Sequence, residues 1–139
     1  MSELTRLSIS LERPLLTRLE RLVRGSGYTN RSEFVRDMIR ERLVEQEWAD
    51  QQTEVVGTIT LLYDHDARQL SDRLTDIQHE HHEQILASTH VHLSRRLCAE
   101  MIMVRGRAGE IRHLLEHLRQ QRGVLHAALG MSSTGQRLR

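Results

Sequence analysis

The chain has 139 residues, a formal net charge of +1 at pH 7, nine histidines and a single cysteine. One cysteine excludes an intrachain disulfide, and no apolar run approaches the length of a membrane-spanning helix. The near-neutral charge gives no global electrostatic argument for binding nucleic acid. With no signal peptide visible, we expect a cytoplasmic protein without contact to a membrane.

The first predicted element is a strand over residues 6–11, in which polar and apolar residues alternate. On alternation alone, an ordinary half-exposed strand is the simpler interpretation. A lone strand has two open edges, however, so we expect two copies of the chain to pair these strands over a shared helical core. A two-stranded ribbon fits the major groove of DNA. Its outward side chains, which would contact the bases, are Arg6, Ser8 and Ser10.

Two helices are predicted after this strand. Pro14 favours the first turn of one helix, and the segment Gly25-Ser26-Gly27 favours its end. Asn30 is a good N-cap for the next helix, and Glu33 stands at the capping-box position. The residues after Trp48 are mostly polar, which predicts a linker over residues 49–53.

The second half of the chain is predicted to form a separate α/β domain. We expect strands over residues 55–63, 85–93, 98–104 and 124–129, and helices over residues 66–83 and 108–122. The order βαββαβ is typical of a ferredoxin-like fold, in which helices cover one sheet face and leave the other open. The fold class is therefore α+β, with domains at 1–48 and 54–130 and a flexible tail at 131–139.

The most informative pattern is a set of histidines followed by the cysteine. His90 and His92 stand two residues apart on a predicted strand and share a face, and Cys98 follows on the next strand. The apolar odd-numbered residues around them predict that both histidines lie on the open face. His79 is expected to point away from the core of its own helix, on the other side of the sheet, so a shared site would take His79 from another copy. Imidazole and thiolate donors suit a borderline transition metal rather than magnesium or calcium.

These motifs resemble two known families. Residues 4–48, and residues 27–36 in particular, resemble ribbon-helix-helix repressors. Over nearly the whole chain, the sequence is similar to the NikR family of nickel-responsive regulators, whose signature is H-x-H-H, then H-x-H, then a cysteine six residues on. That signature is present here as residues 79–82, residues 90–92 and Cys98.

The resemblance implies a function and a set of site residues. The family binds one Ni(II) per protomer in a square plane of three imidazole nitrogens and one thiolate sulfur. This implies ligation by His90, His92 and Cys98 of one protomer and His79 of its neighbour. It also implies a homotetramer, built as a dimer of dimers, that binds a palindromic DNA operator and represses nickel-uptake genes. The start of the second helix would hold a DNA phosphate through Asn30, Arg31 and Ser32.

Further residues are expected near metal or cation sites, and two alternative functions stay open. The family places Tyr63 and Glu100 near the metal, and acids equivalent to Glu33 and Asp37 at a cation site. The remaining histidines of the first motif, His81 and His82, could form a weaker metal site or be exposed.

One alternative is a ribbon-helix-helix regulator that senses copper or an amino acid. The other, a metal-dependent enzyme, is poorly supported because the sequence has no credible nucleophile–base set.

Overall fold

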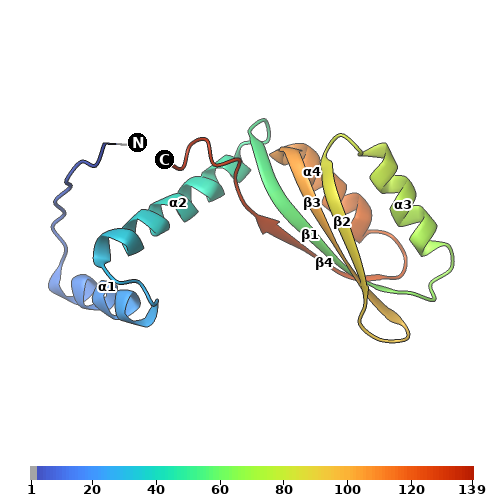
Figure 1. Ribbon diagram of the computed structural model, residues 1–139, viewed down its shortest axis with the longest axis horizontal. Coiled ribbons are helices and arrows are strands. Elements are labelled where there is room, and N and C mark those ends of the chain that lie inside the picture. The colour runs from blue at the N-terminus through green and yellow to red at the C-terminus, as the bar shows by residue number, and fades with distance from the viewer. Residues whose placement is uncertain (1–2) are drawn as a thin grey trace. The chain divides into compact units, whose positions relative to one another are not determined.

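The computed structural model describes residues 3–139, which divide into two compact units (Figure 1). The first unit runs to Leu43 and includes residues 137–139, and the second comprises Val44–Gln136. Within the described chain, no helix is both long enough and apolar enough to cross a membrane.

The first unit contains α1 (Arg13–Gly25) and the beginning of α2 (Arg31–Ala49). Pro14 lies in the first turn of α1, where its missing N–H costs no helical hydrogen bond. The chain leaves α1 through Gly27, whose φ of +78° lies in the left-handed region. Asn30 caps α2, because its Oδ1 accepts the backbone N–H of Glu33 at 2.9 Å. Both predicted helices are therefore present.

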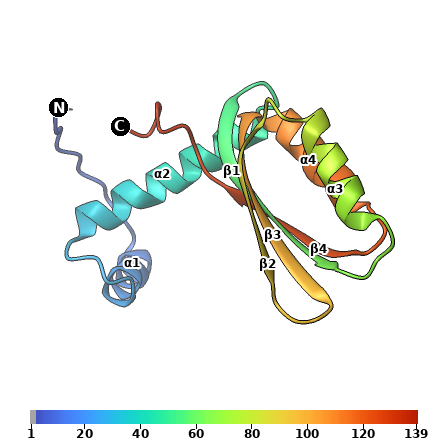
Figure 2. The same cartoon turned by 45° about the vertical axis from the view of Figure 1, so that its right-hand side comes forward.

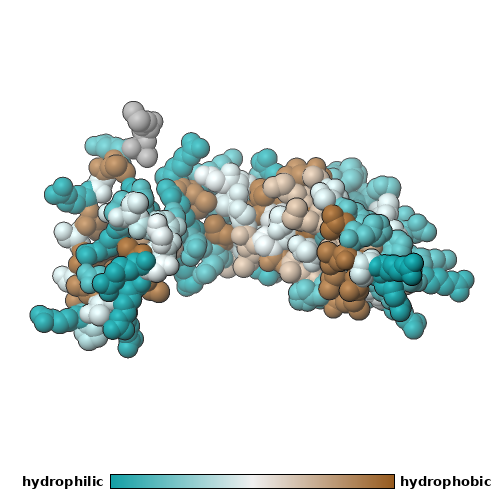
Figure 3. All heavy atoms as spheres, turned by 60° about the horizontal axis from the view of Figure 1, so that its bottom comes forward, coloured by the Kyte–Doolittle hydropathy of each residue, from teal (hydrophilic) through white to brown (hydrophobic). Residues whose placement is uncertain are grey.

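The predicted strand over residues 6–11 is absent from the single chain, since residues 3–12 have no regular secondary structure. The described part of the first unit contains no second extended segment to pair with, and a strand needs hydrogen bonds from a neighbour. None of residues 3–43 is buried. Leu7 and Ile9 are 74% and 64% exposed, and Figure 3 shows apolar side chains at the surface. The described residues of the first unit thus form no closed core of their own.

The second unit is a four-stranded sheet with two helices, and its elements are β1 (Glu54–Asp64), α3 (Leu70–Glu80), β2 (Ile85–His92), β3 (Leu97–Arg107), α4 (Ala108–Arg119) and β4 (Val124–Met131). Its strand order is β2-β3-β1-β4, and every neighbouring pair is antiparallel. Figure 2 shows α3 and α4 on the same side of this sheet. This architecture confirms the predicted βαββαβ order and the α+β class.

Helix α3 is shorter than the predicted helix over residues 66–83. The Asp64 carboxylate accepts the backbone N–H of Asp66 at 2.9 Å, which favours a turn at the point where the helix was expected to begin. Gln69 then adopts a left-handed φ of 59° directly before Leu70. The periodicity of apolar residues located the helix, whereas side-chain bonds to the backbone set its start.

Trp48 belongs to the core of the second unit, which differs from the domain end and linker expected there. Its side chain is 1% exposed, and its indole N–H donates to the Ser132 carbonyl at 2.8 Å. A Cβ on Gly57 would lie only 3.0 Å from the indole ring, so this glycine leaves room for it. Burial of this large aromatic side chain places the last turn of α2 in the core of the second unit.

A register shift in β2 reverses the predicted placement of the two histidines. Ile85 pairs with Val104, but Ala87 pairs with Met103, so Leu86 is an extra residue in a β-bulge. Beyond the bulge, His90 lies opposite Glu100 and His92 opposite Cys98. Cys98 is fully buried and lies opposite the buried Tyr63 of β1, which marks the helix-covered face. The expectation that His90 and His92 lie on the open face is therefore wrong.

Candidate metal centre

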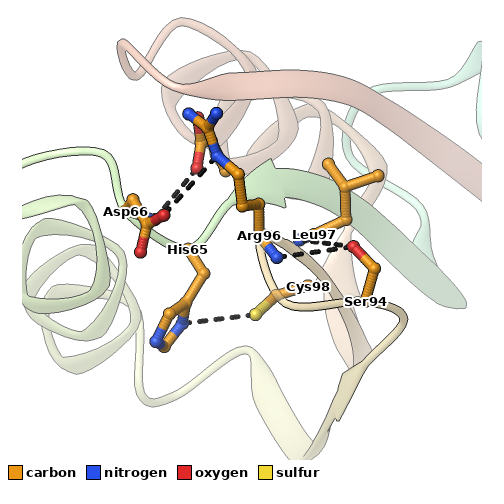
Figure 4. Close-up of polar contacts among 7 residues, drawn as sticks. His65, Asp66, Ser94, Arg96, Leu97 and Cys98 are labelled. Atoms are coloured by element: carbon orange, nitrogen blue, oxygen red, sulfur yellow. Dashed lines mark hydrogen bonds and ion pairs between the residues drawn. The ribbon is translucent and has the colours of Figure 1, made fainter.

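A cluster of potential metal-binding side chains lies where β1, β2 and β3 meet the adjoining loops. The Cys98 sulfur lies 3.4 Å from Nδ1 of His92 and 3.4 Å from Nδ1 of His65. The donor atoms of these three residues all lie within 4.8 Å of one another. Figure 4 shows the His65 ring turned toward the sulfur. One thiol and two imidazoles already converge within a single chain.

His90 extends this cluster along the same face of β2. Its ring centroid lies 5.0 Å from that of His92. The hydroxyl of Tyr63 lies 3.5 Å from Nδ1 of His90, so Tyr63 is positioned to orient this ring. The structure thus brings together three of the four predicted ligands, namely His90, His92 and Cys98.

His79 is not part of this cluster. It is exposed in the last turn of α3, and its carbonyl oxygen lies 3.1 Å from Nδ1 of His82. His79 was expected on the opposite side of the sheet from the other ligands, but the bulge in β2 turns His90 and His92 to the helix-covered face. In the structure His79 is exposed to solvent. The imidazoles next to the Cys98 sulfur are those of His92 and His65 of the same chain.

Sequence reasoning missed His65. The pairing of β1 with β3 would have indicated that His65 lies near Cys98, because Tyr63 lies opposite Cys98 and His65 follows two residues later. The ring of His65 lies 5.1 Å from that of His92. The pairing of β1 with β3 is long-range information, which a local motif search does not contain.

An ion-pair network holds the segment that carries His65. Arg96 pairs with Asp64 at 3.3 Å and with Asp66 at 3.5 Å (Figure 4). The backbone N–H of His65 donates to the carbonyl of Arg96 at 2.6 Å. These bonds join the end of β1 to the loop before β3, so His65 is held beside the sulfur from two sides.

Burial raises the pKa values of two side chains at this centre, Cys98 and Tyr63. Burial, with a smaller effect of Asp66, raises the pKa of the Cys98 thiol, so the thiol is protonated at neutral pH. Burial together with the charges of Glu100 and Cys98 raises the pKa of Tyr63 to about 12. Glu100 accepts hydrogen bonds from Ser88 at 2.7 Å and from Gln78 at 3.1 Å. A metal that binds Cys98 must displace its proton, and nitrogen and sulfur donors suit nickel, copper or zinc.

The predicted DNA-contacting residues lie in the first unit. The base-reading candidates are exposed in the segment 3–12, and they are Arg6, Ser8 and Ser10. Asn30, Arg31 and Ser32 are exposed at the beginning of α2. Arg31 pairs with Glu20 at 3.1 Å, between side chains that are both exposed. This weak surface pair leaves the arginine able to exchange partners.

Glu33 and Asp37 are each engaged by neighbours within the first unit. Glu33 pairs with Arg36 at 3.7 Å, and Asp37 pairs with Arg40 at 2.8 Å. Asp37 also accepts a hydrogen bond from Tyr28. The described residues show no metal-binding cluster that includes either acid.

Comparison with known proteins identifies both units. Residues 56–132 match the family described as NikR C terminal nickel binding domain, and residues 5–46 match the ribbon-helix-helix protein, copG family. The chain is 45% identical over 138 residues to a "putative nickel-responsive regulator" of Geotalea uraniireducens, covering 99% of each chain. A relative of the same name from Geobacter metallireducens is 46% identical with the same coverage.

A solved structure supports the fold. An uncharacterized protein from Thermotoga maritima superposes with a TM-score of 0.51 at 15% identity, covering 56% of this chain and 96% of that one. The family matches span most of the chain, and the relatives match it from end to end. The chain therefore belongs to the NikR family of nickel-responsive transcriptional regulators, which are not enzymes, and consists of a ribbon-helix-helix unit joined to a nickel-binding unit.

Proposed function

We propose that the chain is a nickel-dependent, sequence-specific DNA-binding regulator that represses nickel-uptake genes. The observation that carries this proposal is the convergence of Cys98, His92 and His90 on one sheet face of a nickel-binding unit that is joined to a ribbon-helix-helix unit. Nickel occupancy would control DNA binding, and no chemistry would be done on the metal.

In this proposal, each chain holds one Ni(II) through His90, His92 and Cys98, with His79 supplied by a neighbouring chain. The exposure of His79 and its absence from its own chain's group of donor atoms support a role between chains. Tyr63 lies at Nδ1 of His90, which leaves the other ring nitrogen for the metal. Glu100 would not bind the metal directly, because its carboxylate already accepts hydrogen bonds from Ser88 and Gln78.

The first unit would bind DNA as a dimer. Its N-terminal segment and its two helices border a hollow of about 780 Å³, lined mostly by apolar side chains and open to solvent. A second copy would cover this surface and supply the missing strand partner. The paired strands would present Arg6, Ser8 and Ser10 to the bases, while Asn30, Arg31 and Ser32 would meet a phosphate at the positive end of α2.

The second unit would join two such dimers. Its open sheet face carries Val91, Met101 and Met103, which are 48%, 52% and 44% exposed. Exposed apolar side chains grouped on one face favour association. A homotetramer built this way binds both halves of a palindromic operator, and the second half-site gains from the high effective concentration.

The test is nickel-dependent footprinting of the full-length protein on the DNA upstream of its own gene and of candidate nickel-uptake genes. We expect a two-fold symmetric footprint with Ni(II) and none with a chelator. A footprint that is identical with and without nickel would contradict the proposal. Protection that requires Cu(II) or an amino acid instead would establish the alternative of a regulator that senses another ligand.

A further inference from the structure

A second group of histidines lies between α3 and α4, away from Cys98. His81 directly follows the last residue of α3, while His113 and His117 stand one turn apart on α4. The ring of His81 lies 6.2 Å from each of the other two rings, and those two lie 6.4 Å from one another. Three imidazoles, one from the residue after α3 and two from α4, thus surround one small region of the surface.

The donor atoms of this group come close enough to share an ion. Nitrogen atoms of His81 and His117 and a carboxylate oxygen of Glu80 all lie within 4.8 Å of one another. Ligands around a tetrahedral ion with bonds of about 2.0–2.1 Å are separated by about 3.3 Å, so modest side-chain rotations would complete the site. His81 and His113 also line a hollow of about 500 Å³, which leaves space for solvent ligands.

The fold holds His81 in this position and turns His82 elsewhere. The backbone N–H of His81 donates to the carbonyls of Ile77 and Gln78, each at 3.2 Å, which closes the end of α3. His81 is half-buried against α4, whereas His82 is exposed with its ring at the His79 carbonyl. Of the two remaining histidines of the H-x-H-H motif, His81 lies near further donor atoms and His82 does not.

We propose that Glu80, His81 and His117 form a second site for a divalent transition metal, with His113 beside it as a further donor. Imidazole and carboxylate donors suit Zn(II), Ni(II) and Cu(II). The site contains no sulfur and lies within one chain, so it forms independently of the centre at Cys98. It binds more weakly, because all four of its donors are half-exposed or exposed and stay hydrated until the ion binds.

The experiment titrates the full-length protein with Ni(II) alone in metal-free buffer and measures bound metal per chain by equilibrium dialysis. The wild type is expected to bind one ion tightly and a second more weakly. Cys98→Ala should keep only the weaker ion. Adding His117→Gln to Cys98→Ala should remove that ion, and adding His126→Gln, an exposed histidine outside both clusters, should not.

X-ray absorption of the Cys98→Ala protein loaded with nickel gives a second readout, and we expect nitrogen and oxygen neighbours without sulfur. Glu80→Gln provides a milder variant on an exposed side chain, and circular dichroism checks that each variant is folded. Equal metal binding by Cys98→Ala with and without His117→Gln would overturn the proposal. If Cys98→Ala binds as the wild type does while His117→Gln loses one ion, the second site stands and the proposed nickel centre fails.

Discussion

The sulfur of Cys98 lies 3.4 Å from Nδ1 of His92, directly across the β2–β3 pair. This contact joins a buried thiol to an exposed imidazole at the edge of the sheet. A metal ion can therefore reach the sulfur from solvent, although the cysteine itself is fully buried.

Removing the thiol should abolish nickel binding at this centre. We expect Cys98→Ala to eliminate the sulfur-to-nickel charge-transfer absorption and to weaken tight nickel binding by more than about 100-fold, which exceeds the usual effect of residues outside the ligand set. Spectral titration with a competing chelator measures both quantities. His126→Gln serves as the control, and survival of the band in Cys98→Ala would exclude this residue as a ligand.

His65 and His79 can be separated as candidates for the fourth ligand. If His79 of a neighbouring chain is the ligand, His79→Gln changes the planar nickel spectrum. His65→Gln then retains that spectrum and lowers affinity by about 10–100-fold, because His65 acts from outside the ligand set. The reverse result would assign the fourth position to His65 and would place the whole site within one chain.

Arg6 provides a test of DNA recognition that leaves the metal centre untouched. We expect Arg6→Ala to weaken binding to the footprinted operator by about 1–3 kcal/mol, because a single arginine contact to a base edge contributes that much discrimination. Nickel affinity should not change, since the residue lies in the other unit. Binding assays with Arg122→Ala, an exposed arginine of the second unit, provide the comparison, and equal operator affinity for the two variants would remove Arg6 from the interface.

Trp48 should be a major source of stability for the second unit. We expect Trp48→Ala to lower its free energy of unfolding by about 3–5 kcal/mol, because the substitution leaves a large cavity and an unpaired carbonyl at Ser132. Denaturant unfolding followed by circular dichroism measures the loss. Leu125→Ala, at a side chain that is 60% exposed, is expected to have little effect. Equal stabilities of the two variants would show that Trp48 is not a core residue.

The Tyr28–Asp37 pair predicts a pH effect in the first unit. The hydrogen bond from Tyr28, and then that from Arg40, lower the pKa of Asp37. Because the folded pKa lies below the unfolded value of about 3.9, these bonds stabilise the fold above that pH, and their contribution is lost as the pH falls through the folded pKa. Tyr28→Phe should raise the pKa of Asp37, measured by carboxyl NMR, whereas Tyr63→Phe should not. An unchanged value in Tyr28→Phe would contradict the pairing.

Local patterns were sufficient for most of the secondary structure. Asn30 caps α2 as expected, and the apolar periodicity located α1, α3 and α4, because these signals depend on residues three or four positions apart. The H-x-H and cysteine spacing likewise predicted three residues that converge, since neighbouring antiparallel strands place such positions opposite one another.

The sequence by itself determined the βαββαβ order, the donor types and the resemblance to nickel-responsive regulators. Only the tertiary structure decided which sheet face carries His90 and His92, because one extra residue at Leu86 reverses the alternation of side chains beyond it. It also decided that Trp48 is core and that His65 lies beside Cys98. These relationships depend on strand register and on contacts between residues far apart in the chain, which no local pattern contains.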